Sequence, residues 1–209
     1  MNYLDTLTWN RREHFEFFKF FSDPYFSITV EVDVTKAFAY SKENKKSFFA
    51  LYLHACIKAV NSVENFKYRI EGEKVAVYPI INVSTTILRP DNTFGFSYIL
   101  FDENFDVFNQ NFEKEKERVF SSNDLFSPVD SEDCVYCSAL PWVNFSGHKE
   151  SLSGFRVESV PKLAFGKYKE KEGKLLMPLA ISVNHALMDG YHVGLFIDKY
   201  QKALNNVDL

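Results

Sequence analysis

The sequence lacks the features of an exported or membrane-spanning chain. Its first fifteen residues, MNYLDTLTWNRREHF, become charged before any apolar run develops, unlike a signal peptide. No apolar stretch approaches the roughly 18 residues of a membrane helix. The best one, Leu175 to Val183, contains Pro178 and Ser182. Three cysteines are an odd number for disulfide pairing, which favours a reducing compartment. We therefore expect a cytoplasmic protein without a membrane partner.

The sequence also lacks glycine-rich phosphate-binding motifs, an excess of basic residues and a recognisable set of metal ligands. None of the eight glycines stands in a G-x-G-x-x-G or phosphate-loop spacing. The net charge is −4, from 24 Lys and Arg against 28 Asp and Glu, which gives no electrostatic footprint for nucleic acid. Cys134 and Cys137 form a C-x-x-C with no second pair, so two thiols on a strand are favoured over redox or zinc chemistry. We expect no metal and no nucleic-acid partner.

Aromatic residues are abundant. The 209 residues include 22 Phe, 11 Tyr and 2 Trp. Each buried ring removes about 150–250 Å² from water, so the chain can build a large core without disulfides. This composition excludes disorder and fibrous repeats. It leaves open whether some rings line a ligand pocket or a subunit interface.

Hydrophobic periodicity predicts an α+β fold. Helices are expected over residues 9–21, 47–63, 104–122 and around 193–204, and Ser47 is placed to cap the second. Strands are expected at 26–34, 67–70, 75–78, 83–88, 93–100, 134–145, 163–168 and 175–183. No repeat or linker interrupts this pattern, so residues 1–209 are expected to form one domain. Its mixed β-sheet should be covered by helices on one face.

The segment NHALMDGYHVG is the most informative for chemistry. It places His185 at the end of an apolar strand and follows it with Asp189 and Gly190. A titratable imidazole at the edge of a strand suits proton transfer in a cleft. H-x-x-x-D-G alone is a weak signal, expected by chance in roughly one or two per cent of chains this long. On these residues alone, the favoured interpretation is that His185 is a structural histidine and that Asp189 caps a helix.

Five segments together resemble the chloramphenicol acetyltransferase family. In chain order they are WNRREHFEF (9–17), SALPWVNF (138–145), FGKY (165–168), LLMPLAISV (175–183) and NHALMDGYHVG (184–194). They occur in the family's order and spacing over nearly the whole chain. The resemblance implies a CoA-dependent acyltransferase fold, acetyl-CoA as co-substrate with no tightly bound cofactor, and a homotrimer with active sites at its subunit interfaces.

The resemblance also implies the catalytic roles. His185 resembles the general base that takes a proton from an acceptor hydroxyl as it attacks the thioester, with the other ring nitrogen bonded to the histidine's own backbone carbonyl. Ser138 matches the serine that stabilises the oxyanion of the tetrahedral intermediate. Asp189 and Arg11 match an ion pair that holds the His185 loop.

Cofactor contacts are less well marked. Lys167 and Tyr168 match the family's segment near the adenosine end of CoA, although an ordinary strand lysine and tyrosine remain an equal alternative. The lysine-rich run 42–46 is in reach of CoA phosphates in principle, and a solvated loop is the favoured reading.

Departures from the family lie mainly around the acceptor. Phe18 stands where some members have a tyrosine, and Phe94 and Phe96 match pocket positions, the latter an alanine in members of the family. His148 falls where an apolar aromatic is expected. At the catalytic end, Asn184 replaces a histidine and Ala164 a threonine, neither of which should abolish turnover. The acceptor pocket is predicted to be narrower on one wall and more polar on another.

These observations predict an acetyl-CoA-dependent O-acetyltransferase acting on chloramphenicol, and hence an antibiotic-resistance function. The first alternative is the same chemistry on another hydroxylated small molecule. The second is an assembly protein like the acyltransferase core of 2-oxo acid dehydrogenase complexes, which shares H-x-x-x-D-G. No lipoyl domain or Ala/Pro-rich linker precedes Trp9, so that alternative is not favoured.

Overall fold

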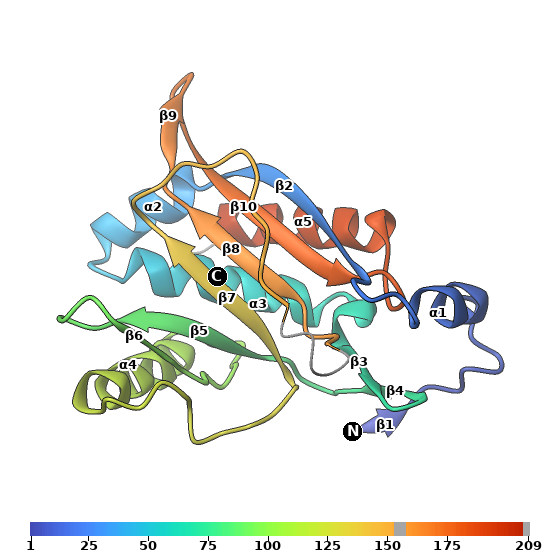
Figure 1. The fold of residues 1–209 in the computed structure, drawn as a ribbon. Coiled ribbons are helices and arrows are strands. Elements are labelled where there is room, and N and C mark those ends of the chain that lie inside the picture. Colours follow the sequence, from blue (N-terminus) through green and yellow to red (C-terminus); the bar gives the residue numbers. More distant parts are fainter. Residues whose placement is uncertain (153–157, 207–209) are drawn as a thin grey trace.

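The structure is a computed structural model that describes residues 1–152 and 158–206. Its helices pack on a large sheet, and a smaller sheet lies at one end (Figure 1). The helices are α1 (Arg12–Phe18), α2 (Thr35–Glu43), α3 (Phe48–Asn61), α4 (Phe105–Ser121) and α5 (Gly190–Asn205), with a 3₁₀ turn η1 (Glu64–Lys67). The predicted α+β class is confirmed.

The large sheet has seven strands and is mixed. They are β2 (Tyr25–Asp33), β5 (Asn82–Leu88), β6 (Phe94–Phe96), β7 (Cys134–Leu140), β8 (Lys162–Gly166), β9 (Lys169–Lys171) and β10 (Lys174–Asn184). Their order is β2-β10-β8-β7-β5-β6, with β9 paired to β10. Among the described strands, β7 alone makes parallel pairs, with β5 and β8. The small antiparallel sheet orders β1 (Asn2–Tyr3), β4 (Lys74–Val77) and β3 (Tyr68–Glu71).

Helices α2, α3 and α5 cover one face of the large sheet, while α4 packs beside β6 (Figure 1). Helix α3 begins as predicted at Ser47, whose side chain accepts a hydrogen bond from the Ala50 amide at 3.2 Å. Side chains from the helices and the central strands form one core, which includes Leu53, Ile57, Leu163, Leu179, Ile181 and Phe196. On the other face, the segment after β7 crosses in front of β8 and β10 (Figure 1).

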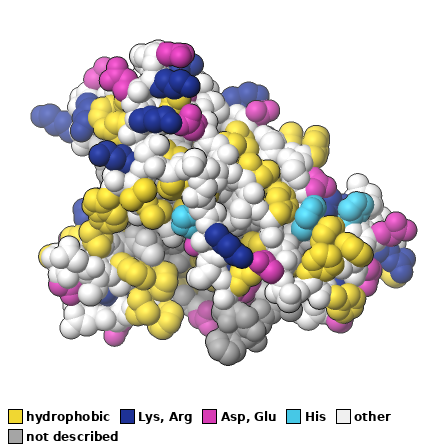
Figure 2. All heavy atoms as spheres, turned by 45° about the horizontal axis from the view of Figure 1, so that its top comes forward, with side chains coloured by type: hydrophobic (Ala, Val, Ile, Leu, Met, Phe, Trp, Pro, Cys, Tyr) yellow, Lys and Arg dark blue, Asp and Glu magenta, His cyan; other side chains and the backbone are white. Residues whose placement is uncertain are grey.

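The aromatic residues divide between core and surface. Phe66, Phe108 and Phe196 are completely buried, whereas Phe20 is 76% exposed and Phe126 is 71% exposed. Figure 2 shows hydrophobic side chains reaching the surface in several separate groups on one face. Such groups on a monomer typically mark ligand or protein contacts, so the aromatic excess is more than core material.

Several elements differ from the sequence prediction: β1, β9 and η1 were not predicted, and the strand expected at 93–100 is only Phe94–Phe96. Helix α1 ends at Phe18 instead of Phe21. Of its residues only Phe15 is buried, so the helical spacing of its aromatic residues did not indicate a face that packs in the core. Helix α2 was not predicted because it buries only Ala37 and Ser41 and has no side-chain cap. Strand β7 ends at Leu140 because the next residue, a proline, has no amide to donate to the ladder.

Candidate active site

His185 follows the last residue of β10, where that strand leaves the sheet. Its amide donates to the Pro24 carbonyl at 2.8 Å, which ties it to the start of β2. The imidazole is stacked on the Phe18 ring, with centroids 4.2 Å apart, and the Phe26 ring lies at 4.6 Å. Two rings therefore fix the plane of a half-buried imidazole.

The hydrogen bond of His185 determines which ring nitrogen is available. Nδ1 lies 3.2 Å from the Met188 carbonyl oxygen. Because a carbonyl only accepts, Nδ1 carries the hydrogen in this contact, and in the neutral ring the lone pair is then on Nε2. The prediction that Nδ1 bonds the carbonyl of His185 itself is wrong. The His185 carbonyl oxygen instead accepts a hydrogen bond from Arg11 Nη2 at 3.2 Å. The turn after β10 brings the Met188 carbonyl to the ring in its place.

The predicted pairing of Arg11 with Asp189 is present. Arg11 Nη1 donates to Asp189 Oδ2, and the arginine is only 7% exposed. Asp189 Oδ1 accepts from the Tyr191 amide at 3.0 Å and so caps α5. Burial raises the pKa of Asp189, but the charges of Arg11 and His192 outweigh it and leave that pKa below its ordinary value. Arg11 thus links the carbonyl of His185 to the start of α5.

His192 belongs to the same network and was not predicted from the sequence. Its Nδ1 lies 2.9 Å from Oδ1 of Asp189, the residue that caps α5. Desolvation by burial lowers the pKa of His192, although Asp189 acts in the opposite direction. The available signal was the reciprocal capping pattern, in which the third helical residue reaches back to the cap.

Ser138 lies on β7 and lines a cavity of about 760 Å³. Phe94 and Phe96 line the same cavity from β6, with ring centroids 5.4 Å apart. Phe126 continues this aromatic wall, and its ring is stacked on Phe96 at 6.0 Å. Hydroxyl groups occupy much of the remaining lining, which includes Ser84, Thr86, Tyr98, Tyr136 and Ser151. The structure therefore brings three of the predicted residues to one cavity.

Phe18 and His148 do not line that cavity. Phe18 is instead stacked on His185. His148 lines a neighbouring cavity of about 230 Å³ together with Asp23, Tyr25 and Ser27. Phe18 lies away from the cavity because α1 packs at the end of β10, beside His185, and not next to β5, β6 and β7 (Figure 1).

Lys167 and Tyr168 follow the end of β8, away from Ser138. The Lys167 amide donates to the Val143 carbonyl at 2.8 Å, and its side chain is exposed. The Tyr168 ring packs against Phe38 and Phe48, at centroid distances of 5.2 and 6.1 Å. In the 42–46 run, Lys46 is paired with Asp106 at the start of α4, at 2.6 Å.

The two substituted positions are buried without strain. Asn184 accepts from the Ala186 amide and donates to the Glu158 carbonyl, both at 2.9 Å. Ala164 is fully buried on β8 opposite Ser138. Neither substitution leaves the turn after β10 without hydrogen bonds.

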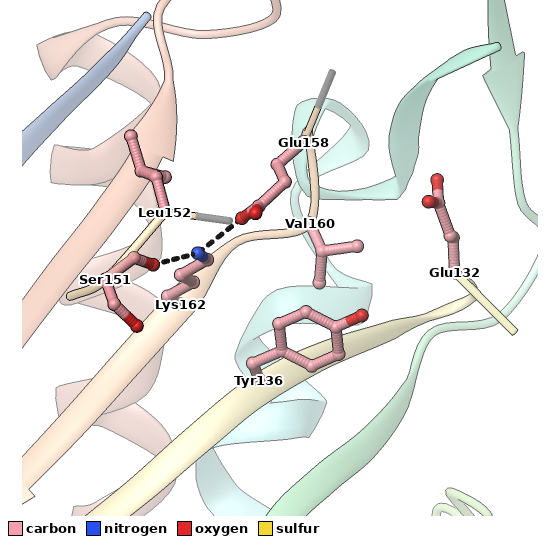
Figure 3. Close-up of a pocket in the computed structure, with 7 residues that line it drawn as sticks. All are labelled: Glu132, Tyr136, Ser151, Leu152, Glu158, Val160 and Lys162. Atoms are coloured by element: carbon pink, nitrogen blue, oxygen red, sulfur yellow. Dashed lines mark hydrogen bonds and ion pairs between the residues drawn. The ribbon is translucent and has the colours of Figure 1, made fainter. Parts of the chain in front are cut away.

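A buried ion pair that the sequence analysis missed lies beside the Ser138 cavity. Lys162 is 7% exposed at the start of β8, and its Nζ donates to Glu158 Oε2 at 2.5 Å and to the Ser151 carbonyl at 2.7 Å. Figure 3 shows the ammonium group between these two oxygens, with the Tyr136 ring on the adjacent strand. The available signal was a lysine at the head of an otherwise apolar strand.

Within one chain, His185 and Ser138 are too far apart to act on one acetyl group. Ser138 is opposite Ala164 on β8, which is opposite Ala180 on β10, two strand spacings away. His185 follows Ala180 by five residues, which is about 17 Å along a strand. Together these offsets place the two backbones roughly 15–20 Å apart.

In the described ranges, no group of three or more His, Cys, Asp or Glu side chains is arranged to hold a metal ion. Cys134 and Cys137 lie buried on β7 with free thiols, and burial raises the pKa of each. No helix of residues 1–152 or 158–206 has the length and apolar character needed to cross a membrane.

Comparison with known proteins gives the family. The family model described as chloramphenicol acetyltransferase matches residues 1–201. The chain belongs to the chloramphenicol acetyltransferase family. It is 30% identical to chloramphenicol acetyltransferase 3 of Escherichia coli, over 99% of both chains. It is also 30% identical to a Bacillus pumilus chloramphenicol acetyltransferase, over 95% of this chain and 91% of that one.

Solved structures of the family have the same fold. A chloramphenicol acetyltransferase superposes with a TM-score of 0.88 at 29% identity, covering 96% of this chain and 98% of the other. The dihydrolipoamide acetyltransferase of Azotobacter vinelandii superposes with a TM-score of 0.69 at 15% identity, covering 94% and 88%. The second likeness concerns the fold alone. As a chloramphenicol acetyltransferase family member, this chain is an acyltransferase with the predicted CoA-dependent acyltransferase fold.

Proposed function

We propose that this protein transfers the acetyl group of acetyl-CoA to a hydroxyl of chloramphenicol. The orientation of His185 carries the proposal. Its Nδ1 contacts the Met188 carbonyl and its ring is held between Phe18 and Phe26, so the lone pair of Nε2 is available to a proton donor. An imidazole in this state acts as a general base near neutral pH.

The reaction follows from that base. Nε2 accepts the hydroxyl proton while the alcohol oxygen forms a bond to the thioester carbonyl carbon. The resulting oxyanion accepts a hydrogen bond from the Ser138 hydroxyl. When the intermediate collapses, the carbon–sulfur bond breaks and the CoA thiolate takes the proton from the imidazolium. The products are an acetyl ester and CoA thiol, and the base returns to its starting state.

Chloramphenicol binds, in this proposal, in the 760 Å³ cavity that Ser138 lines. Phe94 and Phe96 supply an aromatic wall for its nitrophenyl ring, and the serine and tyrosine hydroxyls supply partners for its polar groups. Phe18 is assigned to holding the imidazole instead of contacting the acceptor. His148 is assigned to a neighbouring polar cavity.

We further propose that the active site is completed by a second copy of the chain. His185 and Ser138 of one chain are separated by roughly 15–20 Å along the sheet. A neighbouring copy that presents its His185 to this cavity resolves the separation, and a homotrimer repeats that contact with closed symmetry. The exposed rings of Phe17, on α1, and Phe20, just after it, supply apolar surface for such a contact.

Acetyl-CoA is assigned to the region of Lys167 and Tyr168, as a co-substrate and not a tightly bound cofactor. The exposed Lys167 side chain supplies a positive charge for a phosphate, and the half-buried Tyr168 ring supplies a face for a base. The proposed place of action is the cytoplasm, where acetyl-CoA is made and where free thiols persist.

A thiol-release assay with acetyl-CoA and chloramphenicol tests the proposed function. The wild type should release CoA, and His185→Ala should lower the rate by at least 10²-fold, because general-base catalysis is worth about 10²–10⁴. His14→Ala, at an exposed position of α1, is the matched control and should retain the wild-type rate. Absence of CoA release by the wild type, or wild-type turnover in His185→Ala, would contradict the proposal.

A further inference from the structure

The cavity lined by Ser138 has one wall that is charged as well as hydroxylated. Glu150 and Lys162 line this cavity, and both also line the adjoining 230 Å³ cavity. Phe94, Phe96 and Phe126 line the same cavity. A largely uncharged acceptor with an aryl ring contacts the aromatic side chains and gains no attraction from the charged ones.

The positive charge on this wall is already neutralised inside the protein. Lys162 has its Nζ 2.5 Å from Glu158 Oε2 and 2.7 Å from the Ser151 carbonyl (Figure 3). The side chains of Lys162 and Glu158 are 9% and 15% exposed. A buried ion pair of this geometry is costly to separate. Lys162 is therefore a structural cation and is poorly placed to attract an anionic acceptor.

Glu150 is in a different situation. In the described part of the chain it forms one ion pair, with His148, where Nδ1 lies 3.7 Å from Oε1. This pair carries attraction only when His148 is protonated. The carboxylate therefore adds negative charge to a cavity that is also lined by aromatic rings. Carboxylates and ring faces both attract cations, so the two kinds of side chain favour the same kind of group.

We propose that Glu150 is a specificity-determining residue that favours acceptor alcohols carrying a cationic ammonium group. The inference rests on the proposed acetyl transfer and extends it to a class of acceptor. The reaction is unchanged: the acetyl group replaces the hydroxyl proton, CoA thiol is released, and the ammonium group takes no part in bond making. Glu150 acts on binding and orientation only.

The test compares two acceptors that share one diol. The first is chloramphenicol. The second is the amino diol left when its dichloroacetyl group is removed, converted to the quaternary trimethylammonium form so that only oxygen can be acetylated. For each, kcat/KM is measured by thiol release, and the product is identified by mass spectrometry. The proteins are wild type, Glu150→Gln, Glu150→Leu and the control Glu117→Gln, an exposed carboxylate on α4.

Glu150→Gln keeps the shape of the side chain and removes its charge. We expect it to lower kcat/KM for the ammonium acceptor by about tenfold relative to chloramphenicol, while Glu117→Gln leaves the ratio at its wild-type value. Glu150→Leu, which also removes the polar end of the side chain, should lower the ratio further. An unchanged ratio in both Glu150 variants, with chloramphenicol still acetylated, would overturn this inference alone. No CoA release by the wild type with either acceptor would overturn the proposed function as well.

Discussion

Ser138 is one of several serines in the same cavity, yet its position on β7 gives it a distinct expected role. We predict that Ser138→Ala lowers kcat for acetyl transfer by about 10²–10³-fold, because a single hydrogen bond to a developing oxyanion is worth that much. Ser84→Ala, on the neighbouring strand β5 and in the same cavity, is the matched control and should affect KM more than kcat. Equal losses of kcat in the two variants would show that Ser138 is an ordinary lining residue.

Asp189 combines a charge and a helix cap in one carboxylate. Asp189→Asn keeps a cap acceptor and loses the ion pair with Arg11, whereas Asp189→Ala loses both. We predict that the alanine variant is the less stable, by about 1 kcal/mol, the usual value of an N-cap side chain. Urea unfolding followed by circular dichroism measures both. Equal stability of the two variants would contradict the capping role.

The same carboxylate should give stability a dependence on acid pH. Its pKa is lower in the folded protein than in the unfolded chain, so its charge stabilises the fold above the unfolded pKa of about 4. That contribution disappears as the pH falls through the lower, folded pKa. The stability advantage of wild type over Asp189→Asn should therefore be constant from about pH 5 to pH 8 and shrink below about pH 4. An advantage that does not change down to about pH 2 would contradict this assignment.

At the scale of elements, the end of β8 depends on a glycine. A Cβ added at Gly166 would lie 2.6 Å from Pro178 Cγ and 2.9 Å from the Val143 carbonyl oxygen. That carbonyl accepts from the amide of Lys167, so the contact fixes the segment after β7 against the end of β8. We predict that Gly166→Ala lowers the melting temperature and raises KM for acetyl-CoA. Gly147→Ala, where a Cβ meets nothing within 4 Å, is the control and should change neither.

Periodicity predicted the elements that bury a clear face and missed those that do not. The strand that became β10 and the helix that became α3 were predicted within a few residues, because each is buried along nearly its whole length. Helix α2 has only two buried residues and gave no apolar stripe. The residues of the candidate site were likewise predicted in part and missed in part. The pairing of Arg11 with Asp189 came from a resemblance between short segments, whereas the ion pair of Lys162 with Glu158 needs tertiary structure to be seen.

At the scale of the whole molecule, the separation of His185 from Ser138 is the feature with the widest consequence. The proposed base and the proposed oxyanion donor lie roughly 15–20 Å apart along one sheet. We therefore expect each reaction to use two copies of the chain. Sedimentation equilibrium of the wild type should give a trimer, and a monomer at working concentrations would contradict this requirement.

Subunit mixing tests whether acetyl transfer uses His185 of one copy and Ser138 of another. His185→Ala and Ser138→Ala chains are unfolded together in equal amounts, refolded, and assayed for thiol release with acetyl-CoA and chloramphenicol. Random assembly unites an intact His185 with an intact Ser138 at about a quarter of the interfaces, so about a quarter of wild-type activity should return. Activity no greater than the average of the two variants refolded separately would contradict the account.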